Sequence, residues 1–362
     1  NRGDNTQLIG VFQGKLENPN LKWETTTEWN FGLDFGFLNN RILASVEFYH
    51  RVISDLLNYK PLNYYHDISS VMANIGKTQS TGLEITINTT NVKTRDFKWT
   101  TNLTFTTYKD RWKERTPDWK PAVYEKVDDP IRADHILQIG EAVPAAQPDL
   151  RPGELVIKDL NGYKRDANGQ PEVDANGRFI LTGGPDGKID DADVELIGSQ
   201  DPGWMAGMVN TFNYKDFDLS FQLNGMFDRR MEDPTEMTYG LGGGELAQYG
   251  YNALTIIKKR WTWDNPSTKY PCSFNGWNTT YTHGDWYYQN AWFVRLSNIT
   301  LGWNMPKAWV AKTKYISRVH LSLSASNLFC LTPYKGLDPE TDYYTAAYPN
   351  ARTYSLGVNI TF

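Results

Sequence analysis

The chain has 362 residues, with 37 Lys and Arg against 42 Asp and Glu, and its net charge is −5. This acidic balance disfavours a general nucleic-acid binder. Two cysteines, Cys272 and Cys330, are too few for a disulfide-built fold or a four-thiolate zinc site. No stretch approaches about 18 uninterrupted apolar residues, which excludes a helical membrane protein but leaves a strand barrel open.

Alternation of apolar and polar residues with a period of two is the strongest pattern in the chain. Apolar residues occupy every second position from Trp29 to Phe37, a polar turn follows at 38–41, and the alternation resumes at Ile42. The unit recurs as far as the last residue, Phe362. The pattern predicts nine strands, with approximate ranges 29–37, 42–51, 83–88, 97–105, 206–214, 217–224, 293–303, 319–325 and 354–362.

The connections between these strands are alternately short and long. The four long ones are about 53–80, 109–203, 228–290 and 329–350. They are rich in Gly, Pro, Asp and Asn and show no sustained helical period apart from a short helix near 253–261. Transmembrane barrels have short periplasmic turns and long outer loops. The sequence therefore predicts an all-β fold, a transmembrane antiparallel β-barrel, with Phe362 at the periplasmic edge.

A soluble antiparallel sandwich is the alternative, because its strands also alternate. Soluble strands average about five or six residues, whereas several strands here alternate for about ten. Aromatic residues make up 14% of the chain, and Trp and Phe gather near strand ends, as in the aromatic girdles of membrane barrels. Both features favour the membrane barrel.

Seven segments carry a family resemblance and follow the family's order along almost the whole chain. One of them reads Asn74-Ile-Gly-Lys-Thr-Gln-Ser-Thr-Gly-Leu-Glu84. The seven are residues 18–34, 74–84, 152–155, 197–202, 293–302, 326–328 and 336–340. In these segments the chain resembles the SusC/RagA family of TonB-dependent outer-membrane transporters.

The resemblance implies a plugged barrel of about 22 strands, of which this chain holds the last nine. Residues 1–362 are then the C-terminal part of the barrel with its long extracellular loops, and the plug domain and N-terminal strands are absent. Nine strands cannot close, and an open edge in lipid leaves backbone groups without hydrogen bonds. We therefore expect an N-terminal polypeptide, with the plug and first strands, in the same particle.

By resemblance, the function is TonB-dependent active import of oligosaccharides or oligopeptides across the outer membrane of a Gram-negative bacterium. The implied partners are a SusD-like surface lipoprotein, TonB acting through the missing part, outer-membrane lipids and a glycan or peptide substrate. Polar lumen residues are expected at Glu84, Asp218, Gln222 and Asn224. A passive structural or adhesin-type surface barrel and a soluble carbohydrate-binding or hydrolytic β-protein are the alternatives.

An Asp-rich loop suggests calcium. Family members continue an Asp-Leu-Asn-Gly motif directly into Asp-Gly-Lys-Ile-Asp, but here an insertion at 163–185 separates the two halves. Hard cations take six to eight oxygen ligands, which alternate positions in such loops can supply. The candidate ligands of a structural Ca²⁺ are Asp159, Asn161, Asp186, Asp190 and Asp193. A solvated, turn-rich hairpin is an equal alternative.

Aromatic residues crowd the third long loop, where amides and carboxylates lie between them. Such a mixture offers both stacking and hydrogen bonds to sugar rings or extended peptides. The alternatives are that the rings pack the loops together or belong to the girdle. The predicted ligand or lid contacts are Trp261, Trp263, Asn275, Trp277, His283, Asp285, Trp286 and Tyr287.

Catalysis finds little support in the sequence. The five histidines show no metal-binding spacing, and no Gly-x-Ser-x-Gly motif occurs. His50 and His320 fall within predicted strands and are expected to be wall residues. We predict no enzyme activity, no catalytic residue and no required cofactor. Cys272 and Cys330 both lie on the long-loop side, where a disulfide and two free thiols are equal alternatives.

Overall fold

The computed structural model of the protein describes most of the chain. The described residues are 16–62, 68, 70–115, 129–131, 133–137, 139–142, 155–174, 179–188, 190–199, 201–236, 239–240, 250, 252–266, 270, 285, 288–313, 315–341 and 348–362. Within them, no helix is both long and apolar enough to cross a membrane.

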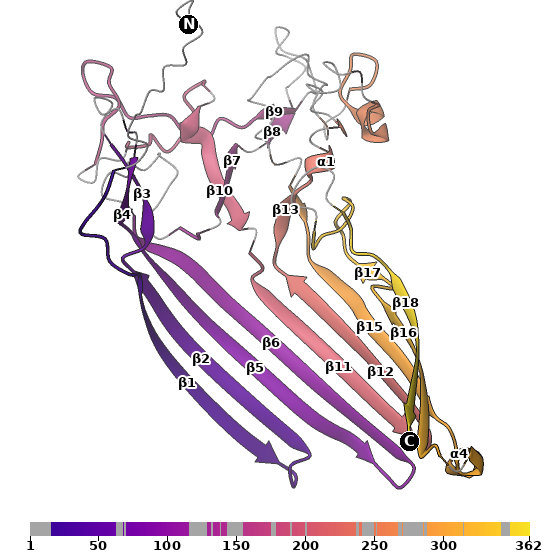
Figure 1. Cartoon of the computed structure of the whole chain (residues 1–362). Coiled ribbons are helices and arrows are strands. Elements are labelled where there is room, and N and C mark those ends of the chain that lie inside the picture. Colours follow the sequence, from indigo (N-terminus) through magenta and orange to yellow (C-terminus); the bar gives the residue numbers. More distant parts are fainter. Residues whose placement is uncertain are drawn as a thin grey trace, which may run out of the picture.

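One large antiparallel sheet dominates the structure (Figure 1). Its strand order is β1-β2-β5-β6-β11-β12-β15-β16-β18, so the nine predicted strands are confirmed. The bounds are β1 Thr25–Phe37, β2 Ile42–Ser54, β5 Lys77–Lys93, β6 Phe97–Glu114, β11 Trp204–Tyr214, β12 Phe217–Phe227, β15 Phe293–Asn304, β16 Arg318–Ser326 and β18 Thr353–Thr361. The short β17 (Cys330–Leu331) also pairs with β15.

Short turns and long connections lie at opposite ends of the sheet. The turns after β1, β5, β11 and β15 lie at the bottom of Figure 1, together with the C-terminus, and the long connections lie at the top. The first turn is tight because Leu38, Asn39 and Asn40 all have positive φ, a conformation that Asn tolerates better than most residues. The predicted alternation of connections, and Phe362 at the short-turn end, are both confirmed.

Small elements occupy the long connections. Four two-stranded sheets are formed by β3 (Leu57–Pro61) with β4 (Ser70–Asn74), β7 (Ala133–Leu137) with β10 (Val194–Ser199), β8 (Ile139–Ala142) with β9 (Leu155–Ile157), and β13 (Arg230–Glu232) with β14 (Tyr288–Asn290). The short helices there are η1 (Asp191–Asp193), α1 (Pro234–Glu236) and η3 (Thr255–Lys259), and η3 confirms the helix predicted near 253–261. On the short-turn side, α4 (Lys307–Val310) and η5 (Ala311–Thr313) follow β15.

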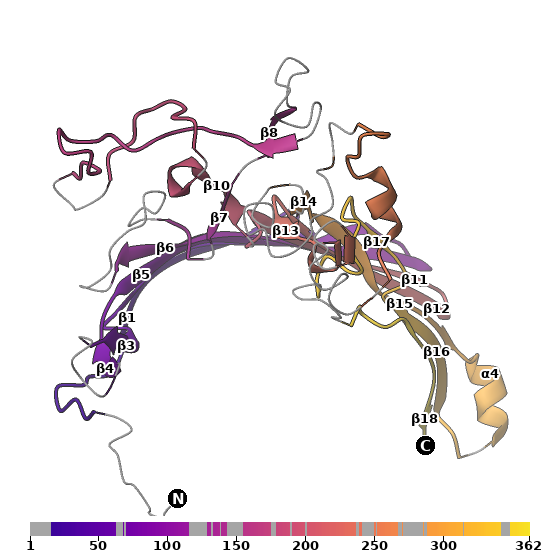
Figure 2. The ribbon, with the colours of Figure 1, turned by 90° about the horizontal axis from the view of Figure 1, so that it is seen from above.

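The sheet is curved and has one continuous apolar face. The register places Leu219, Leu301, Leu323 and Leu356 in one row across four strands. Leu356 is 78% exposed and Leu323 is 56% exposed, which would be costly in water but suits lipid. Seen from above in Figure 2, α4 lies outside the curve of β16 and β18. Since Trp309 of α4 contacts Trp303, the apolar face is the convex one.

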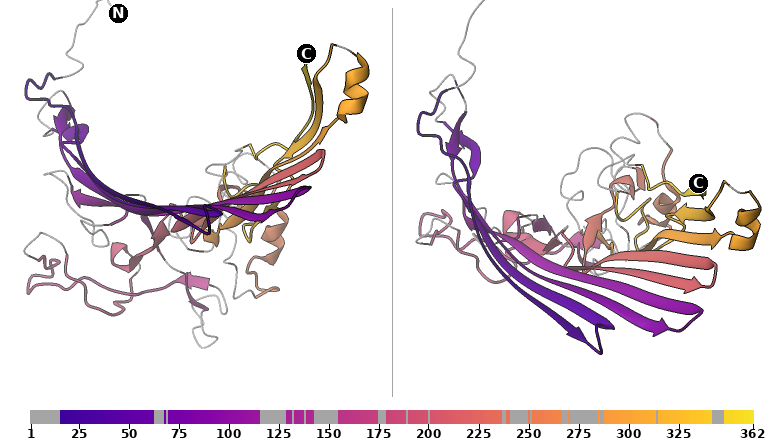
Figure 3. Two further views of the ribbon diagram at one scale, coloured as in Figure 1. Left: turned by 90° about the horizontal axis from the view of Figure 1, so that it is seen from below. Right: turned by 60° about the horizontal axis from the view of Figure 1, so that its bottom comes forward.

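The concave face is polar. Ser220, Thr300, Ser324 and Ser355 form one cross-strand row on it, next to the apolar row just described. Figure 3 shows from two further directions how the sheet encloses this side without closing. In the described strands, β1 and β18 end the sheet. An apolar convex face and a polar concave face are the arrangement of a wall segment of a membrane barrel.

Two rows of aromatic rings border the apolar face. Near the short turns, Phe97 and Trp99 stack on Phe212, and Phe217 stacks on Trp303. Near the long loops, Trp204 stacks on Phe227 with ring centroids 3.8 Å apart. About ten residues separate the rows along a strand, or about 33 Å. A tilt of about 40° reduces this to about 25 Å across the membrane, the expected height of the apolar band.

Candidate functional site

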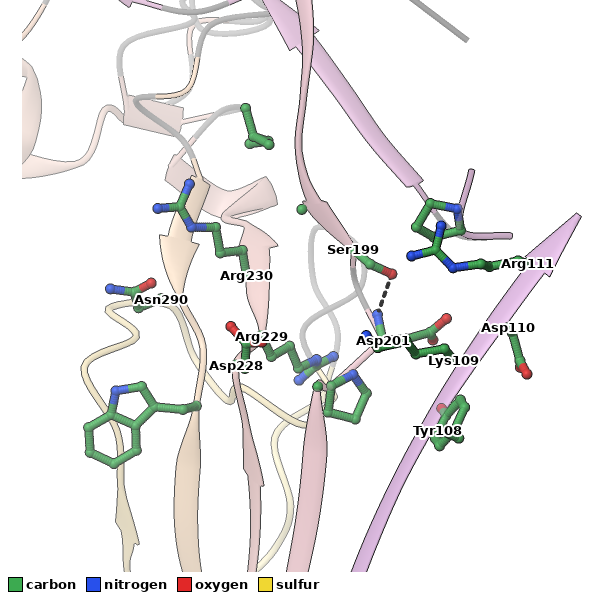
Figure 4. A pocket seen from close by; sticks show the side chains of 16 residues that line it. Tyr108, Lys109, Asp110, Arg111, Ser199, Asp201, Asp228, Arg229, Arg230 and Asn290 are labelled. Carbon is green, nitrogen blue, oxygen red and sulfur yellow. Dashed lines mark hydrogen bonds between the residues drawn. The ribbon is translucent and has the colours of Figure 1, made fainter. Parts of the chain in front are cut away.

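A polar cavity lies at the long-loop end, where β6 parts from β11. Their pairing stops at Thr106 and Met205, whereas β6 continues to Glu114 beside β5. The resulting cavity of about 520 Å³, which we call the mouth cavity, is shown in Figure 4. It is lined by Tyr108, Lys109, Asp110, Arg111, Pro130, Ile197, Gly198, Ser199, Asp201, Pro202, Gly203, Asp228, Arg229, Arg230, Asn290 and Trp292.

Charges of both signs line the mouth cavity. In Figure 4, the β6 residues Lys109, Asp110 and Arg111 lie on one side, and Asp228, Arg229 and Arg230 come from the corner between β12 and β13 on the other. Oδ1 of Asp110 is buried and accepts no hydrogen bond from the described residues. A buried acceptor without a donor is costly unless something else supplies one. The cavity can therefore accept a polar ligand that carries donors as well as acceptors.

Close packing fixes one wall of the mouth cavity. Gly203 precedes β11, and a Cβ atom there would lie 2.6 Å from Oδ2 of Asp228. The backbone N–H of Gly203 donates to the carbonyls of Phe227 and Asp228, and Thr107 Oγ1 donates to the Gly203 carbonyl at 2.7 Å. These contacts tie the end of the second long loop to both β6 and β12.

A buried arginine and two carboxylates join the fourth long loop to the concave wall. Arg295 of β15 donates through Nη2 to Asp338 Oδ1 at 2.6 Å, and its Nε lies 3.0 Å from Glu340 Oε2. The Asp338 carboxylate also accepts the backbone N–H groups of Glu340 and Asn350. Arg295 and Asp338 are both buried. This group, which we call the Arg295 latch, holds the loop against the wall.

A second buried cluster joins the third loop to the fourth. Gln289 Nε2 donates to Asp233 Oδ2 at 3.1 Å and to Glu236 Oε2 at 3.0 Å, while its Oε1 accepts the N–H of Lys335. Burial raises the pKa of Glu236, and the nearby Asp233 carboxylate raises it further. Lys335 and the hydrogen bond from Gln289 partly oppose this rise. The third and fourth loops therefore form one packed unit.

Three of the eight predicted ligand or lid contacts lie in described residues. Trp261 and Trp263 form an edge-to-face pair with ring centroids 5.0 Å apart. Trp261 is buried, whereas Trp263 is 69% exposed, so Trp263 presents its ring to the outside. Asp285 is partly buried. Asn275, Trp277, His283, Trp286 and Tyr287 lie outside the described residues.

The fold brings the five predicted calcium ligands into one region. The insertion forms a hairpin in which Tyr163 pairs with Leu181. At its base, the carboxylate of Asp159 accepts the N–H groups of Asp186 and Gly187, at 3.1 and 2.6 Å. The two halves of the interrupted motif are therefore adjacent, as a shared site requires.

Backbone N–H groups occupy many of the oxygens in this loop. Asp193 is fully buried and accepts three such bonds, from Leu160, Asn161 and Asp190. Asp190 in turn accepts from Ala192 and completes a capping box with Asp193. Across the described residues, no three His, Cys, Asp or Glu side chains form a group able to hold a metal ion. Calcium binding by the loop stays a prediction.

The four expected lumen residues lie on the concave face. The register aligns Glu84 with Glu47 and Thr106, and Asn224 with Gly207 and Arg295. Asp218 contacts His320 at 3.0 Å between Oδ1 and Nε2. His50 lies in β2 beside Thr81, so both strand histidines are wall residues, as expected. Cys330 is a free thiol, and Cys272 lies outside the described residues.

Sequence reasoning missed the buried charges at the mouth. Arg295, Asp338 and Glu340 were not among the predicted site residues, although two of the segments that carry the family resemblance, 293–302 and 336–340, contain them. The signal in the sequence was an arginine in an otherwise apolar strand start, Phe293-Val-Arg-Leu. A buried arginine requires a carboxylate partner, but sequence alone does not identify that partner.

Comparison with known proteins agrees with this architecture. Residues 1–149 match the family model described as TonB dependent receptor-like, beta-barrel. TonB-dependent receptor P3 of Formosa agariphila is 28% identical over 372 residues, covering 98% of this chain and 36% of that receptor. TonB-dependent receptor SusC of Bacteroides thetaiotaomicron is 28% identical over 373 residues, covering 96% and 33%. The chain thus spans about a third of the length of the curated relatives it matches.

Solved structures show the same fold. The structure of the RagAB peptide transporter aligns with 100% of this chain, and the aligned part is 38% of the transporter chain. The TM-score is 0.77 and the sequence identity is 23%. A RagAB peptide importer in an open-open state matches 99% of this chain with a TM-score of 0.75. The alternating wall, the two aromatic rows and these similarities together show the wall of an outer-membrane β-barrel of a Gram-negative bacterium, one that is similar to TonB-dependent receptors over almost the whole chain.

Proposed function

We propose that this chain forms the wall and outer mouth of an active nutrient importer. The observation that carries the proposal is a polar concave wall with a charged mouth cavity at its long-loop end. A polar lumen lets a hydrophilic solute pass a lipid bilayer. TonB-dependent receptors are similar in sequence along almost all of this chain, which supports energised rather than passive passage.

The substrate class that fits this mouth is an oligosaccharide or oligopeptide. The mouth cavity offers cations, carboxylates and the Asn290 amide within one hollow, so it matches a solute with many donors and acceptors. The exposed ring of Trp263 adds a stacking surface on the long-loop side. We propose no catalytic role for any of these residues.

The partner proposed for the long loops is a SusD-like surface lipoprotein that covers the mouth. The Arg295 latch and the Gln289 cluster hold the third and fourth loops as one unit, which gives a covering protein a stable surface. The exposed Trp263 is the kind of residue that anchors such an interface. TonB would act on the remainder of the receptor.

Uptake by cells tests the proposal. Cells that carry the whole receptor receive a labelled oligosaccharide mixture or a labelled oligopeptide mixture, with and without a proton uncoupler. Receptor-dependent uptake of one mixture that the uncoupler abolishes is expected. Uptake that survives the uncoupler would support a passive barrel, and cell attachment without uptake would support an adhesin. A receptor that stays monodisperse and water-soluble without detergent would contradict every membrane-barrel function.

Calcium remains a separate proposal for the hairpin base around Asp159 and Asp193. Its support is that all five predicted ligands lie in one region, and its difficulty is that backbone donors already occupy many of the oxygens. Calorimetry of the intact receptor decides between the alternatives. Heat from Ca²⁺ that Asp186→Asn removes would support the site, and no heat would leave a hairpin held by hydrogen bonds alone.

A further inference from the structure

The turn between β15 and β16 is unlike the other short turns. Residues 38–41, 94–96 and 215–216 connect their strands tightly, whereas residues 305–317 form α4 and η5. The segment is held in place by the N–H of Met305 donating to Val319 and by Thr313 Oγ1 donating to Val310 at 2.7 Å. Val310 is buried. Residues 305–317 thus contain ordered helical turns, and they are much longer than a connection between two neighbouring strands requires.

The turn lies on the lipid side of the wall. Figures 2 and 3 both place α4 outside the curve of the sheet, and Figure 1 places it at the short-turn end. Trp309 meets Trp303 edge to face with centroids 6.1 Å apart, and Trp303 stacks on Phe217. Trp309 is 57% exposed and Tyr315 is 82% exposed. The lower aromatic row therefore continues into the turn, where amphipathic rings suit the headgroup level of a membrane.

Positive charge accompanies these rings. Residues 305–318 contain Lys307, Lys312, Lys314 and Arg318 and no acidic residue. Lys307 and Lys312 are exposed in the structure. Arg318 instead donates to Asn304 Oδ1 through two nitrogens, so it does not belong to the lipid-side group. Lysine stems can lie along apolar surface while their ammonium groups reach the headgroups.

Positive charge is concentrated at the short-turn end of the sheet. The short-turn segments 38–41, 94–96, 215–216 and 305–317 together hold six Lys or Arg residues against two Asp residues, a net charge of +4. Since the net charge of the whole chain is −5, all other residues together carry −9. A positively charged short-turn end on an otherwise acidic chain is complementary in charge to a membrane surface with anionic lipids.

We propose that residues 305–313, with Tyr315, form an interfacial anchor that binds anionic phospholipid headgroups in the leaflet on the short-turn side. Trp309 and Tyr315 lie at the headgroup level, and the ammonium groups of Lys307 and Lys312 contact the phosphates. The proposal does not depend on import, because it needs only the barrel wall and its lipid-facing side. The occupant is lipid rather than a protein because the anchor is continuous with the apolar face.

Retention of lipid by the whole receptor tests this anchor. The receptor is incorporated into nanodiscs of phosphatidylglycerol and phosphatidylcholine, transferred to detergent, and its retained lipids are counted by native mass spectrometry. Replacing both lysines, Lys307→Gln with Lys312→Gln, should reduce retained phosphatidylglycerol at least about fivefold and leave phosphatidylcholine unchanged. The matched control is Lys258→Gln with Lys259→Gln, two exposed lysines of η3 on the long-loop side.

Equal phosphatidylglycerol retention by the wild type and the α4–η5 variant would overturn the proposal, as would an equal loss in the control. If the variant does not insert into nanodiscs, the dependence of phosphatidylglycerol retention on salt concentration, measured with the wild-type receptor, tests the proposal instead. Phosphatidylglycerol bound by lysines should be lost as salt rises, because exposed charges are screened. Retention that is independent of salt would overturn the proposal.

Discussion

Removing the negative charge of Asp338 should release the fourth loop from the wall. Asp338 is buried and accepts hydrogen bonds from Arg295, Glu340 and Asn350. Breaking a buried ion pair by removing one partner costs about 3–5 kcal/mol. Glu340 stays within 3.0 Å of Arg295 and Asn keeps an acceptor oxygen, which lowers the expected cost of Asp338→Asn to about 2–3 kcal/mol. Local opening should therefore become about 30- to 150-fold more frequent.

Hydrogen exchange followed by mass spectrometry measures this opening directly. In the intact receptor, peptides that cover 329–341 should exchange faster by that factor in Asp338→Asn, while peptides of β5 and β6 stay unchanged. The control is Glu172→Gln, which breaks a partly exposed pair with Lys164 at 2.8 Å and should cost less than about 1 kcal/mol. The Arg295 latch does not hold the loop if Asp338→Asn speeds exchange in 329–341 no more than Glu172→Gln speeds exchange in the hairpin that contains Glu172.

Three further perturbations follow from the same contacts. Burial raises the pKa of Glu236 above its ordinary value of 4.5, so the folded loops bind this proton more tightly than unfolded ones, and loop stability should fall as pH rises through that raised value. Glu236→Gln should reduce the loss of thermal stability as pH rises above 4.5, and an unchanged dependence of the unfolding midpoint on pH would contradict the assignment. A Cβ at Gly82 would overlap the Tyr49 ring, so Gly82→Ala should destabilise the barrel by about 1–3 kcal/mol in denaturant titration. Most of that loss should disappear in a Tyr49→Leu background, and additive effects would show that the ring is not the obstacle. Trp263→Ala should weaken binding of the proposed covering lipoprotein by about tenfold or more in a pull-down titration, whereas Phe37→Ala on the lipid face should not. Equal affinities would remove Trp263 from the proposed interface.

The strands were predictable because lipid and lumen impose opposite chemistry on alternate residues. From Trp29 to Phe37 every second side chain is apolar, and the register places them all on one face. The upper end of β6 was missed because Lys109-Asp110-Arg111 is polar on both faces above the membrane, where alternation carries no signal. The predicted long loop 109–203 therefore begins only after Glu114.

The site was less predictable because its contacts join residues far apart in the chain. Arg295 and Asp338 are separated by 43 residues, and nothing in either local sequence specifies the other. Aromatic content did identify the third loop, but it could not tell the buried Trp261 from the exposed Trp263. The Asp-rich loop was recognised from its spacing, yet spacing does not show that backbone N–H groups bind the Asp193 carboxylate.

Labelling of single cysteines on whole cells tests the central claim, that the long loops face outward and the short turns face the periplasm. In a receptor with Cys272→Ser and Cys330→Ser, Val173→Cys places a thiol on the second long loop and Lys215→Cys places one in a short turn. Both positions are exposed in the structure. A membrane-impermeant maleimide should label Val173→Cys on intact cells, and Lys215→Cys only after the outer membrane is opened. Labelling of Lys215→Cys on intact cells, with Val173→Cys protected, would contradict the orientation and the importer built on it.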